Sequence, residues 1–309
     1  MGNNYFYVLE KITMKILTSS YTLDLAGVPT FTKTFFDEVK KRGDEIKVFS
    51  PLGGKLENEM EVIKDLKTSD FVPDIIISQH NTCAEILKNH FPTVPHIFYS
   101  HGLLPEIEQP PTFECEFYFA INTEVKNNLI SKGIDKNKIA VIRDFVDLDK
   151  FKSTKPINQT LTNVLFISNY KKWKNFKIIT EACRINNLNL KCVGAPYGRS
   201  KDIAKDVNES DLVVSWGRGV LEAMASERCV LSFDKTVGDG YIDRENYFRA
   251  RENNFSGRIN NINFSPTSLA LEMLKYNPKD GTKNKKLIEK YHNPKIETDK
   301  IYEHIRNYC

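Results

Sequence analysis

The sequence has no pair of cysteines at a metal-ligand or redox spacing. Its 6 cysteines are scattered over 309 residues, and no two are separated by only two to four residues. Zinc-ribbon and thioredoxin-type sites require such spacings, so the cysteine pattern argues against both. We therefore expect reduced cysteines with structural roles, which pack as small hydrophobic side chains.

Long apolar runs are also missing. The longest is about five residues, whereas a membrane-spanning helix needs ~20. The first 13 residues show no basic-then-apolar signal pattern. The sequence therefore predicts a cytoplasmic chain without an integral membrane segment, and it leaves peripheral membrane contact open.

Glycine, proline and excess charge are scarce. The chain has 15 Gly and 13 Pro, and its 44 Lys and Arg against 40 Asp and Glu give a net charge of +4. This composition excludes a disordered or collagen-like chain, and the charge alone does not predict nucleic-acid binding. At ~100–200 residues per domain, the length predicts about two domains.

Strand and helix patterns alternate along the chain. Apolar runs that predict strands follow Met14 and recur later; they lie at 45–49, 74–78, 96–100, 117–121, 139–142, 164–168, 190–194, 211–215 and 229–232. Helical periodicity lies between several of them, at 31–42, 124–132, 176–186 and 220–227. Alternating strands and helices predict two doubly wound α/β domains.

The polar segment 152–162 contains Pro156, shows no periodicity and is the linker candidate. It separates a first domain, 14–151, from a second, 163–285. We interpret residues 1–13 as an N-terminal extension. Residues 286–309 are expected to form a helical tail that packs back on the first domain.

One glycine-containing turn between a strand and a helix has the features of a phosphate site. The segment is Ser215-Trp216-Gly217-Arg218-Gly219-Val220-Leu221-Glu222-Ala223-Met224-Ala225. The free N–H groups at a helix start suit a pyrophosphate, and Arg218 adds a planar cation that matches phosphate oxygens. Glu222 can accept hydrogen bonds from ribose hydroxyls. On chemistry alone, an ordinary turn in which Glu222 only complements the helix dipole is an equal alternative.

This run resembles the donor-nucleotide motif of family 4-type glycosyltransferases with the GT-B fold, whose helix begins with a near-identical Leu-Glu-Ala-Met-Ala. Four other segments resemble that family in the expected order: 14–50, 95–102, 132–151 and 164–182. The resemblance covers residues 14–235. It implies two Rossmann-like domains that face a central cleft, with the acceptor side in the first and the nucleotide-sugar site in the second.

The resemblance also implies roles for individual residues. His101 should lie near the donor sugar and diphosphate, Lys174 should bind phosphate, and Glu222 should contact the nucleotide ribose; these three are the catalytic candidates. The donor-binding candidates are Gly27, Asn169, Lys171, Lys172, Arg218, Gly219, Val220 and Leu221.

Three positions depart from the family pattern. Asn169 stands where the family has an arginine, and Lys171, Lys172 or Arg218 would have to replace its charge. Val214 stands where the family has a second glutamate that commonly recognises the transferred sugar. The first loop has Ala26-Gly27 in place of two glycines.

Simpler interpretations of the same side chains stay open. His101 can be an ordinary hydrogen-bonded loop histidine, and the lysines near 171–174 can be a solvated face. His80, His90 and His96 have no matching ligand set, so no metal site is expected. If the reaction inverts configuration, a general base is needed, and Asp24, His101 and Glu106 are the candidates.

The resemblance implies a hexosyltransferase-type enzyme that moves a sugar from a UDP-, GDP- or ADP-sugar to a hydroxyl acceptor, with retention and without a metal or cofactor. A cell-surface glycan or glycolipid acceptor follows from the resemblance. A modified DNA base, as in phage-type enzymes, is an alternative, because the stretch 279–286 is basic. A non-catalytic nucleotide-sugar-binding protein, suggested by Asn169 and Val214, and a GT-B epimerase that acts on a nucleotide sugar also stay open.

Overall fold

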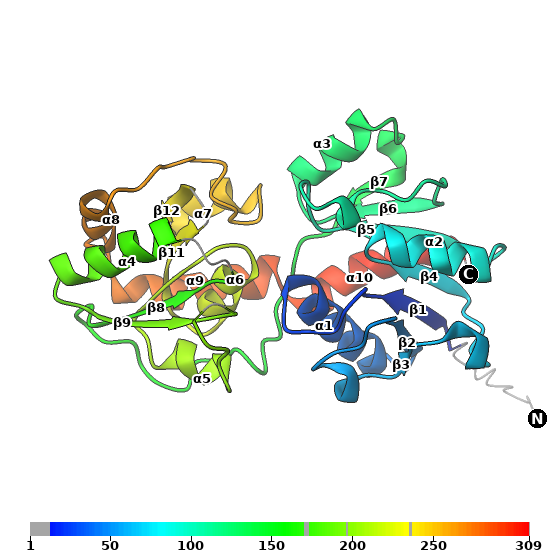
Figure 1. The fold of residues 1–309 in the computed structure, drawn as a ribbon, viewed down its shortest axis with the longest axis horizontal. Helices are drawn as coiled ribbons and strands as arrows, with labels where there is room; N and C mark the ends of the chain where they lie inside the picture. Colours follow the sequence, from blue (N-terminus) through cyan, green and yellow to red (C-terminus); the bar gives the residue numbers. More distant parts are fainter. Residues whose placement is uncertain (1–12, 170–172, 196, 235–236, 309) are drawn as a thin grey trace, which may run out of the picture.

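The computed structural model describes residues 13–169, 173–195, 197–234 and 237–308. Its strands form two sheets, which lie in two halves of the molecule (Figure 1). Strands and helices alternate in both halves, so the predicted α/β fold is confirmed. No helix within the described ranges is long and apolar enough to cross a bilayer.

The first half contains a seven-stranded sheet in the order β3-β2-β1-β4-β5-β6-β7, in which every neighbouring pair is parallel. Its strands are β1 (Lys15–Ser19), β2 (Glu45–Phe49), β3 (Val62–Ile63), β4 (Ile75–Ser78), β5 (His96–Ser100), β6 (Phe117–Ala120) and β7 (Ile139–Val141). Its helices are α1 (Gly27–Lys41), α2 (Asn81–His90) and α3 (Thr123–Ser131), with short 3-10 turns η1 (Glu57–Glu59), η2 (Leu66–Thr68), η3 (Glu106–Glu108) and η4 (Lys136–Lys138).

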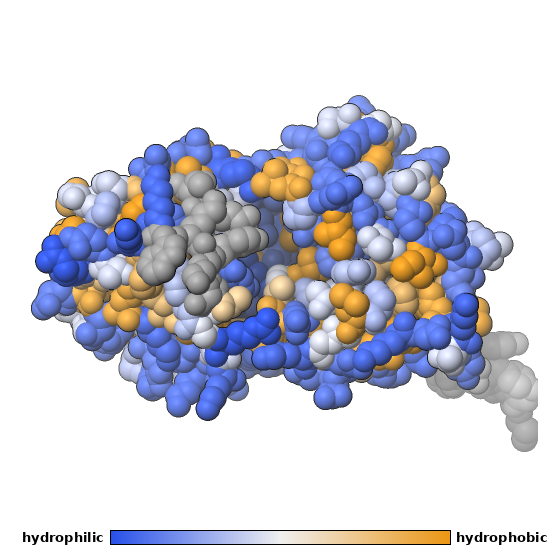
Figure 2. Space-filling view, viewed as in Figure 1, coloured by the Kyte–Doolittle hydropathy of each residue, from blue (hydrophilic) through white to orange (hydrophobic). Residues whose placement is uncertain are grey.

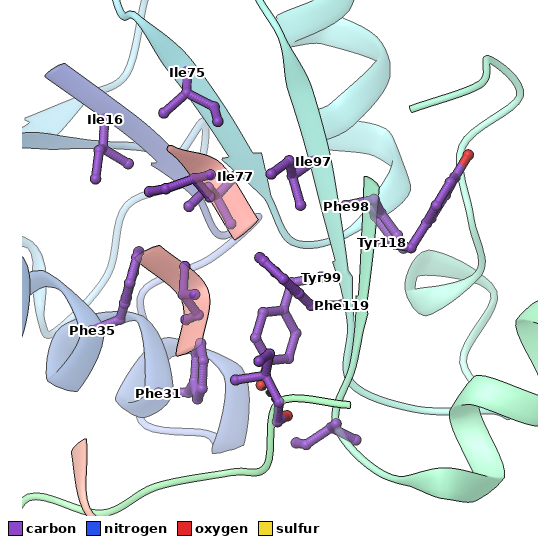
Figure 3. Packing of buried hydrophobic residues seen from close by; sticks show 14 of the residues in the cluster. Ile16, Phe31, Phe35, Ile75, Ile77, Ile97, Phe98, Tyr99, Tyr118 and Phe119 are labelled. Atoms are coloured by element: carbon purple, nitrogen blue, oxygen red, sulfur yellow. Dashed lines mark hydrogen bonds between the residues drawn. The ribbon is translucent and has the colours of Figure 1, made fainter. Parts of the chain in front are cut away.

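Helices cover both faces of this sheet, which explains why the apolar runs of its central strands are continuous. Ile75 and Ile77 face a core that includes Phe31 and Phe35 of α1, as Figure 3 shows. Ile76 faces the opposite side, in a second cluster with residues of α2. Because successive strand residues point to opposite faces, a run of isoleucines supplies both cores.

The second half contains a five-stranded sheet in the order β12-β11-β10-β8-β9, parallel except for the antiparallel edge strand β12. Its strands are β8 (Asn163–Ile167), β9 (Asn189–Val193), β10 (Leu212–Ser215), β11 (Cys229–Asp234) and β12 (Val237–Tyr241). Its helices are α4 (Trp173–Ile185), α5 (Ile203–Asn208), α6 (Arg218–Ala225), α7 (Arg244–Arg251), α8 (Pro266–Met273) and α9 (Pro278–Tyr291).

The chain passes between the halves twice, at neighbouring places. Phe145 belongs to the core of the first half and Val146 to a core of the second. The chain returns after α9, and the Val146 N–H donates to the carbonyl of His292 at 3.2 Å. The two crossings are therefore hydrogen-bonded to each other. The predicted linker, 152–162, has no helix or strand, and its Asn158 and Thr162 N–H groups bond to the Asp211 carboxylate in the second half.

The last helix, α10 (Pro294–Ile305), lies on the first half (Figure 1). Ile301, Tyr302 and Ile305 belong to the core that α1 also fills. The Tyr302 hydroxyl donates to Asp44 at 2.7 Å, and Arg42 pairs with Asp299 at 2.6 Å. The C-terminal segment thus completes a core that begins more than two hundred residues earlier.

Candidate functional site

The carboxyl ends of strands from the two sheets come together between the halves. Arg218 follows β10 in the second half, and its Nη2 lies 3.0 Å from the Thr34 Oγ1 and 3.5 Å from the Thr30 carbonyl, both on α1. Figure 2 shows the surface hollowed between the two halves. Doubly wound folds bind ligands beyond the carboxyl ends of their strands, so this region is the candidate site.

The turn from β10 into α6 requires its two glycines. Gly217 caps the helix with φ +56° and ψ −130°, a conformation that side-chain-bearing residues rarely adopt. A Cβ on Gly219 would lie 2.3 Å from the Ser215 Oγ, and that hydroxyl is fixed by donating to the Ile167 carbonyl. The first N–H groups of α6 have no partner within the helix. Among the backbone N–H groups predicted to bind phosphate, the Val220 N–H donates to the Gly217 carbonyl at 3.1 Å.

Arg218 lies buried between the halves. Its Nη1 donates to the Asp144 carboxylate and to the Phe145 carbonyl, both at 2.8 Å. The side chains of Arg218 and Asp144 are 8% and 6% exposed, which places the ion pair in a poorly solvated environment. The guanidinium therefore bonds mainly to groups of the first half, although it is carried by the second.

Glu222 lies one turn further along α6 and faces the same guanidinium. Its Oε1 is 3.2 Å from the Arg218 Nε, so the two side chains form an ion pair. The Nε–H does not point at this oxygen well enough to make a hydrogen bond. Burial raises the pKa of Glu222, and the charges of Arg218 and Lys150 oppose this increase. Burial also raises the pKa of Asp144, against the same cation. With both carboxylates ionised, the three side chains carry a net charge of −1.

His101 follows β5 and packs among aromatic rings at the same edge. Its ring stacks on Tyr99 at 4.4 Å and meets the edge of Phe31 at 4.7 Å. Burial lowers the pKa of His101 well below its usual value, and the nearby His80 and Arg218 lower it further. Its Nε2 is enclosed without a hydrogen-bond partner among the described residues. His101 is thus a neutral ring with one polar atom unsatisfied.

Gly27 begins α1, the helix whose Thr30 and Thr34 contact Arg218. It is exposed, and a Cβ there would meet nothing within 4 Å, so packing in this chain does not require a glycine. The first N–H groups of α1 also lack intrahelical partners. Two general-base candidates, Asp24 and Glu106, are exposed. Asp24 lies on the loop before α1, 3.9 Å from Arg199 of the second half, and Glu106 begins the 3-10 turn η3.

The loop after β8 carries Asn169, which stands at the family's arginine position. Its Oδ1 accepts a hydrogen bond from the Ala195 N–H at 3.2 Å. Gly194 approaches this loop so closely that a Cβ would lie 1.9 Å from the Ser168 carbonyl. Asn169 therefore helps to join two loops at the carboxyl edge of the second sheet.

Lys174 is exposed in the first turn of α4 and lines a surface cavity of about 400 Å³ with Lys177 and Phe264. Nothing in the described part of the chain brings Lys174 into contact with the Arg218 and Glu222 pair. Lys171 and Lys172 lie outside the described residues.

Sequence reasoning missed three side chains of this region: Asp144, Thr34 and His80. Thr34 and Asp144 gave no local signal, because their partner, Arg218, is far away in the sequence. His80 lies two residues after β4 and His101 one residue after β5, so a position just beyond a parallel strand is the signal that could have found His80. Across the described ranges, no group of three or more His, Cys, Asp or Glu could hold a metal ion.

Comparison with known proteins identifies the fold. No protein-family model and no curated protein match the chain. Among solved structures, a glycosyltransferase of Rickettsia africae aligns with a TM-score of 0.67 and 16% identity over 96% of this chain and 99% of that one. HepE of Anabaena, solved in complex with UDP and glucose, aligns with a TM-score of 0.63 and 14% identity over 95% and 100%.

A third similar structure is an alpha-glucosyltransferase in complex with UDP and a 13-mer DNA containing an HMU base. It aligns with a TM-score of 0.65 and 11% identity over 94% of this chain and 99% of that one. At these identities the likeness concerns the fold. The chain therefore has, over nearly its whole length, the fold of solved glycosyltransferases.

Proposed function

We propose that this protein is a glycosyltransferase of the GT-B type that transfers a sugar from a UDP-sugar to a hydroxyl acceptor. The observation that carries the proposal is the position of Arg218 at the carboxyl ends of strands from both sheets: it is paired with Glu222, and it bonds to Thr34 of α1, the helix whose Phe31 packs against His101. Similar structures hold UDP with glucose or UDP with DNA, which favours UDP over GDP or ADP as the nucleotide.

In this proposal the second half holds the nucleotide diphosphate. The Gly219 N–H and the positive end of α6 contact the phosphates, and Glu222 accepts hydrogen bonds from the ribose. Arg218 is largely neutralised by Asp144 and Glu222, so its main role is to orient Glu222. The charge that develops on the leaving diphosphate must then be met by backbone N–H groups and by Lys174, with Lys171 and Lys172 as further candidates.

His101 supplies the first half's contribution. It is neutral and its Nε2 is unsatisfied, so a sugar or phosphate oxygen that reaches it would remove the cost of that buried atom. We propose retention of configuration, in which the leaving phosphate assists the incoming hydroxyl, and a reaction that uses no metal ion. Closure of the halves would exclude water and limit hydrolysis of the donor.

A modified DNA base is a second acceptor class with specific support. The similar alpha-glucosyltransferase structure contains DNA, which makes such a base the next candidate after a glycan or glycolipid. The basic stretch 279–286 supports it less than the sequence suggests, because Lys283 pairs with Asp280 and Lys285 with Glu227. Binding to modified DNA that weakens with added salt would favour the DNA acceptor.

The donor is tested first by thermal unfolding with UDP-, GDP- and ADP-glucose, because a ligand that binds only the folded state raises the melting temperature. We expect UDP-glucose to give the largest increase. Release of UDP with an acceptor then separates an enzyme from a binding protein, and conversion of the donor without acceptor would indicate an epimerase. If no nucleotide sugar changes the melting temperature, the proposed function is wrong.

Site variants test the residues. Glu222→Ala should lower kcat/KM by about 10- to 100-fold, the range expected for a lost hydrogen bond to a charged group. Glu289→Ala removes the same charge from the exposed surface of α9 and should leave kcat/KM unchanged. Lys174→Ala should also lower turnover, whereas its neighbour variant Lys177→Ala should not. Normal turnover of both Glu222→Ala and Lys174→Ala would refute the site assignment.

A further inference from the structure

His80 has a backbone conformation that is unusual for its residue type. It lies between β4 and α2 with φ +69° and ψ +120°, and a non-glycine residue with positive φ is uncommon and costly. Such residues persist where the surroundings force them, often at binding sites. The conformation by itself indicates only that the position of His80 is strongly determined.

The neighbouring residue shows how the conformation is held. The Gln79 N–H and carbonyl both bond to the Ser19 hydroxyl, at 3.1 and 3.0 Å. The Gln79 side-chain amide donates to Thr18 and Thr32, at 3.2 and 3.0 Å. These buried bonds fix the residue directly before His80 to β1 and α1. The imidazole is thus presented from a rigid support at the carboxyl edge of the sheet.

A single hydrogen bond determines the tautomer of the ring. The backbone N–H of Tyr21 lies 3.0 Å from the His80 Nδ1. A backbone N–H can only donate, so Nδ1 must carry a lone pair and not a proton. Burial lowers the pKa of His80 to about 4, which keeps the ring neutral near pH 7. The one proton of the neutral ring is therefore on Nε2.

The Nε2–H is available to a ligand. It makes no hydrogen bond within the described part of the chain, yet it is not among the enclosed atoms there, in contrast to the Nε2 of His101. His80 and His101 follow β4 and β5, which are parallel neighbours, so both lie at the same carboxyl edge of the sheet. His80 and Arg218 are both close enough to His101 to lower its pKa. His80 is therefore next to the group of residues to which we assign sugar transfer.

We propose that His80 contacts the sugar of the donor, and that its Nε2–H donates a hydrogen bond to a sugar hydroxyl. This inference rests on the proposed function and adds a specificity-determining residue to it. Since Nε2 carries the proton, His80 acts as a donor and not as a general base.

The test compares UDP with UDP-glucose, because only the second carries a sugar. His80→Asn keeps an acceptor oxygen for the Tyr21 N–H and suits a positive φ, but it lacks the Nε2–H. By isothermal titration we expect this variant to bind UDP-glucose about 5- to 10-fold more weakly, as for one lost hydrogen bond, and to bind UDP as the wild type does. His80→Gln, which places an amide N–H near the Nε2 position, should recover part of the loss.

Controls separate this inference from the proposed function. His90→Asn makes the same exchange on an exposed histidine at the end of α2 and should change neither affinity. If His80→Asn binds UDP-glucose like the wild type, or loses UDP and UDP-glucose equally, the sugar contact is wrong while the proposed function stands. If the wild type binds neither ligand, both fail.

Discussion

Burial lowers the pKa of four histidines of this protein, His80, His96, His101 and His292. His80, His96 and His292 are buried, whereas His101 is partly buried. His292 lies where the chain passes between the halves. Its Nδ1 is 2.6 Å from the Asp144 carbonyl, which can only accept, so Nδ1 carries the proton. Its Nε2 is enclosed without a partner among the described residues. A second proton on this ring would therefore be a buried, unpaired charge.

His292 should make the free energy of unfolding depend on pH. Its folded pKa is about 3 against an ordinary value of 6.5. Between about pH 3 and 6.5 His292 binds a second proton in the unfolded chain but not in the folded one. Its contribution to the free energy of unfolding is therefore complete above pH 6.5 and decreases as the pH falls. At pH 5 the loss is about 2 kcal/mol relative to neutral pH. His292→Asn keeps a donor to the Asp144 carbonyl and should lose this part of the dependence.

Urea unfolding of both proteins at pH 7.5 and 5.0 checks this prediction. All other titrating groups contribute equally to both proteins, so they cancel in the difference between the two pH dependences. We expect the wild type to lose about 2 kcal/mol more than His292→Asn on acidification. Equal losses would show that His292 is not held neutral by the fold.

At the scale of elements, helix α10 packs against residues that are far away in the sequence. Ile301 is 1% exposed and packs in the core of the first half, while Ile296 of the same helix is 40% exposed. The helix begins with Asn293 as its cap and Pro294 in its first turn, a start that favours a helix wherever it packs. The cap thus determines the helix, and the apolar face determines where it docks.

Ile301→Ala should lower the free energy of unfolding by about 2–5 kcal/mol, because it leaves a cavity in a packed core. Ile296→Ala is the matched control on the same helix and should change it by less than about 0.5 kcal/mol. Denaturant unfolding of both variants measures the two effects. Similar small values for both would indicate that α10 contributes little to the stability of the first half.

At the scale of the whole molecule, charged pairs join the two halves. Arg143 pairs with Glu252 at 2.8 Å, Arg258 with Glu124 at 2.6 Å, and Arg218 with Asp144 at 2.8 Å. The first two pairs are partly exposed and contribute little. The third is buried, so removal of one partner leaves a charge without compensation.

Arg218→Met should therefore destabilise the protein by about 3–5 kcal/mol, and Arg218→Met with Asp144→Asn should recover much of that loss. In the single variant the folded pKa of Asp144 rises further, so the folded state binds a proton that the unfolded state does not. The loss of stability of Arg218→Met relative to the wild type should therefore become smaller as the pH falls. Urea unfolding of the wild type, Arg218→Met, Asp144→Asn and the double variant at pH 7 and 5 gives the coupling free energy between the two side chains. Additive effects, or a deficit that does not change with pH, would contradict a buried ion pair.

The sequence by itself determined the α/β fold and most strands and helices. Runs such as Ile75–Ser78 and the stripe of Phe31, Phe35 and Val39 report local burial, which depends mainly on neighbours in the chain. Strand β12 escaped prediction because its two glycines weaken the strand pattern. The turn at 215–222 was predicted as a site, and the structure pairs Arg218 with Glu222 of this turn and places Arg218 near enough to His101 to lower its pKa; their roles stay predictions.

Only the tertiary structure decided which distant groups meet. Arg218 faces Asp144 and Thr34, 74 and 184 residues away, and no periodicity in the sequence encodes such pairs. The same holds for α10 in the core of the first half and for the Tyr21 N–H that fixes the proton of His80. A sequence pattern shows which face of an element is buried, whereas the packing of all elements determines what that face is buried against. In this protein that packing places Arg218, a predicted phosphate ligand, between the carboxylates of Asp144 and Glu222.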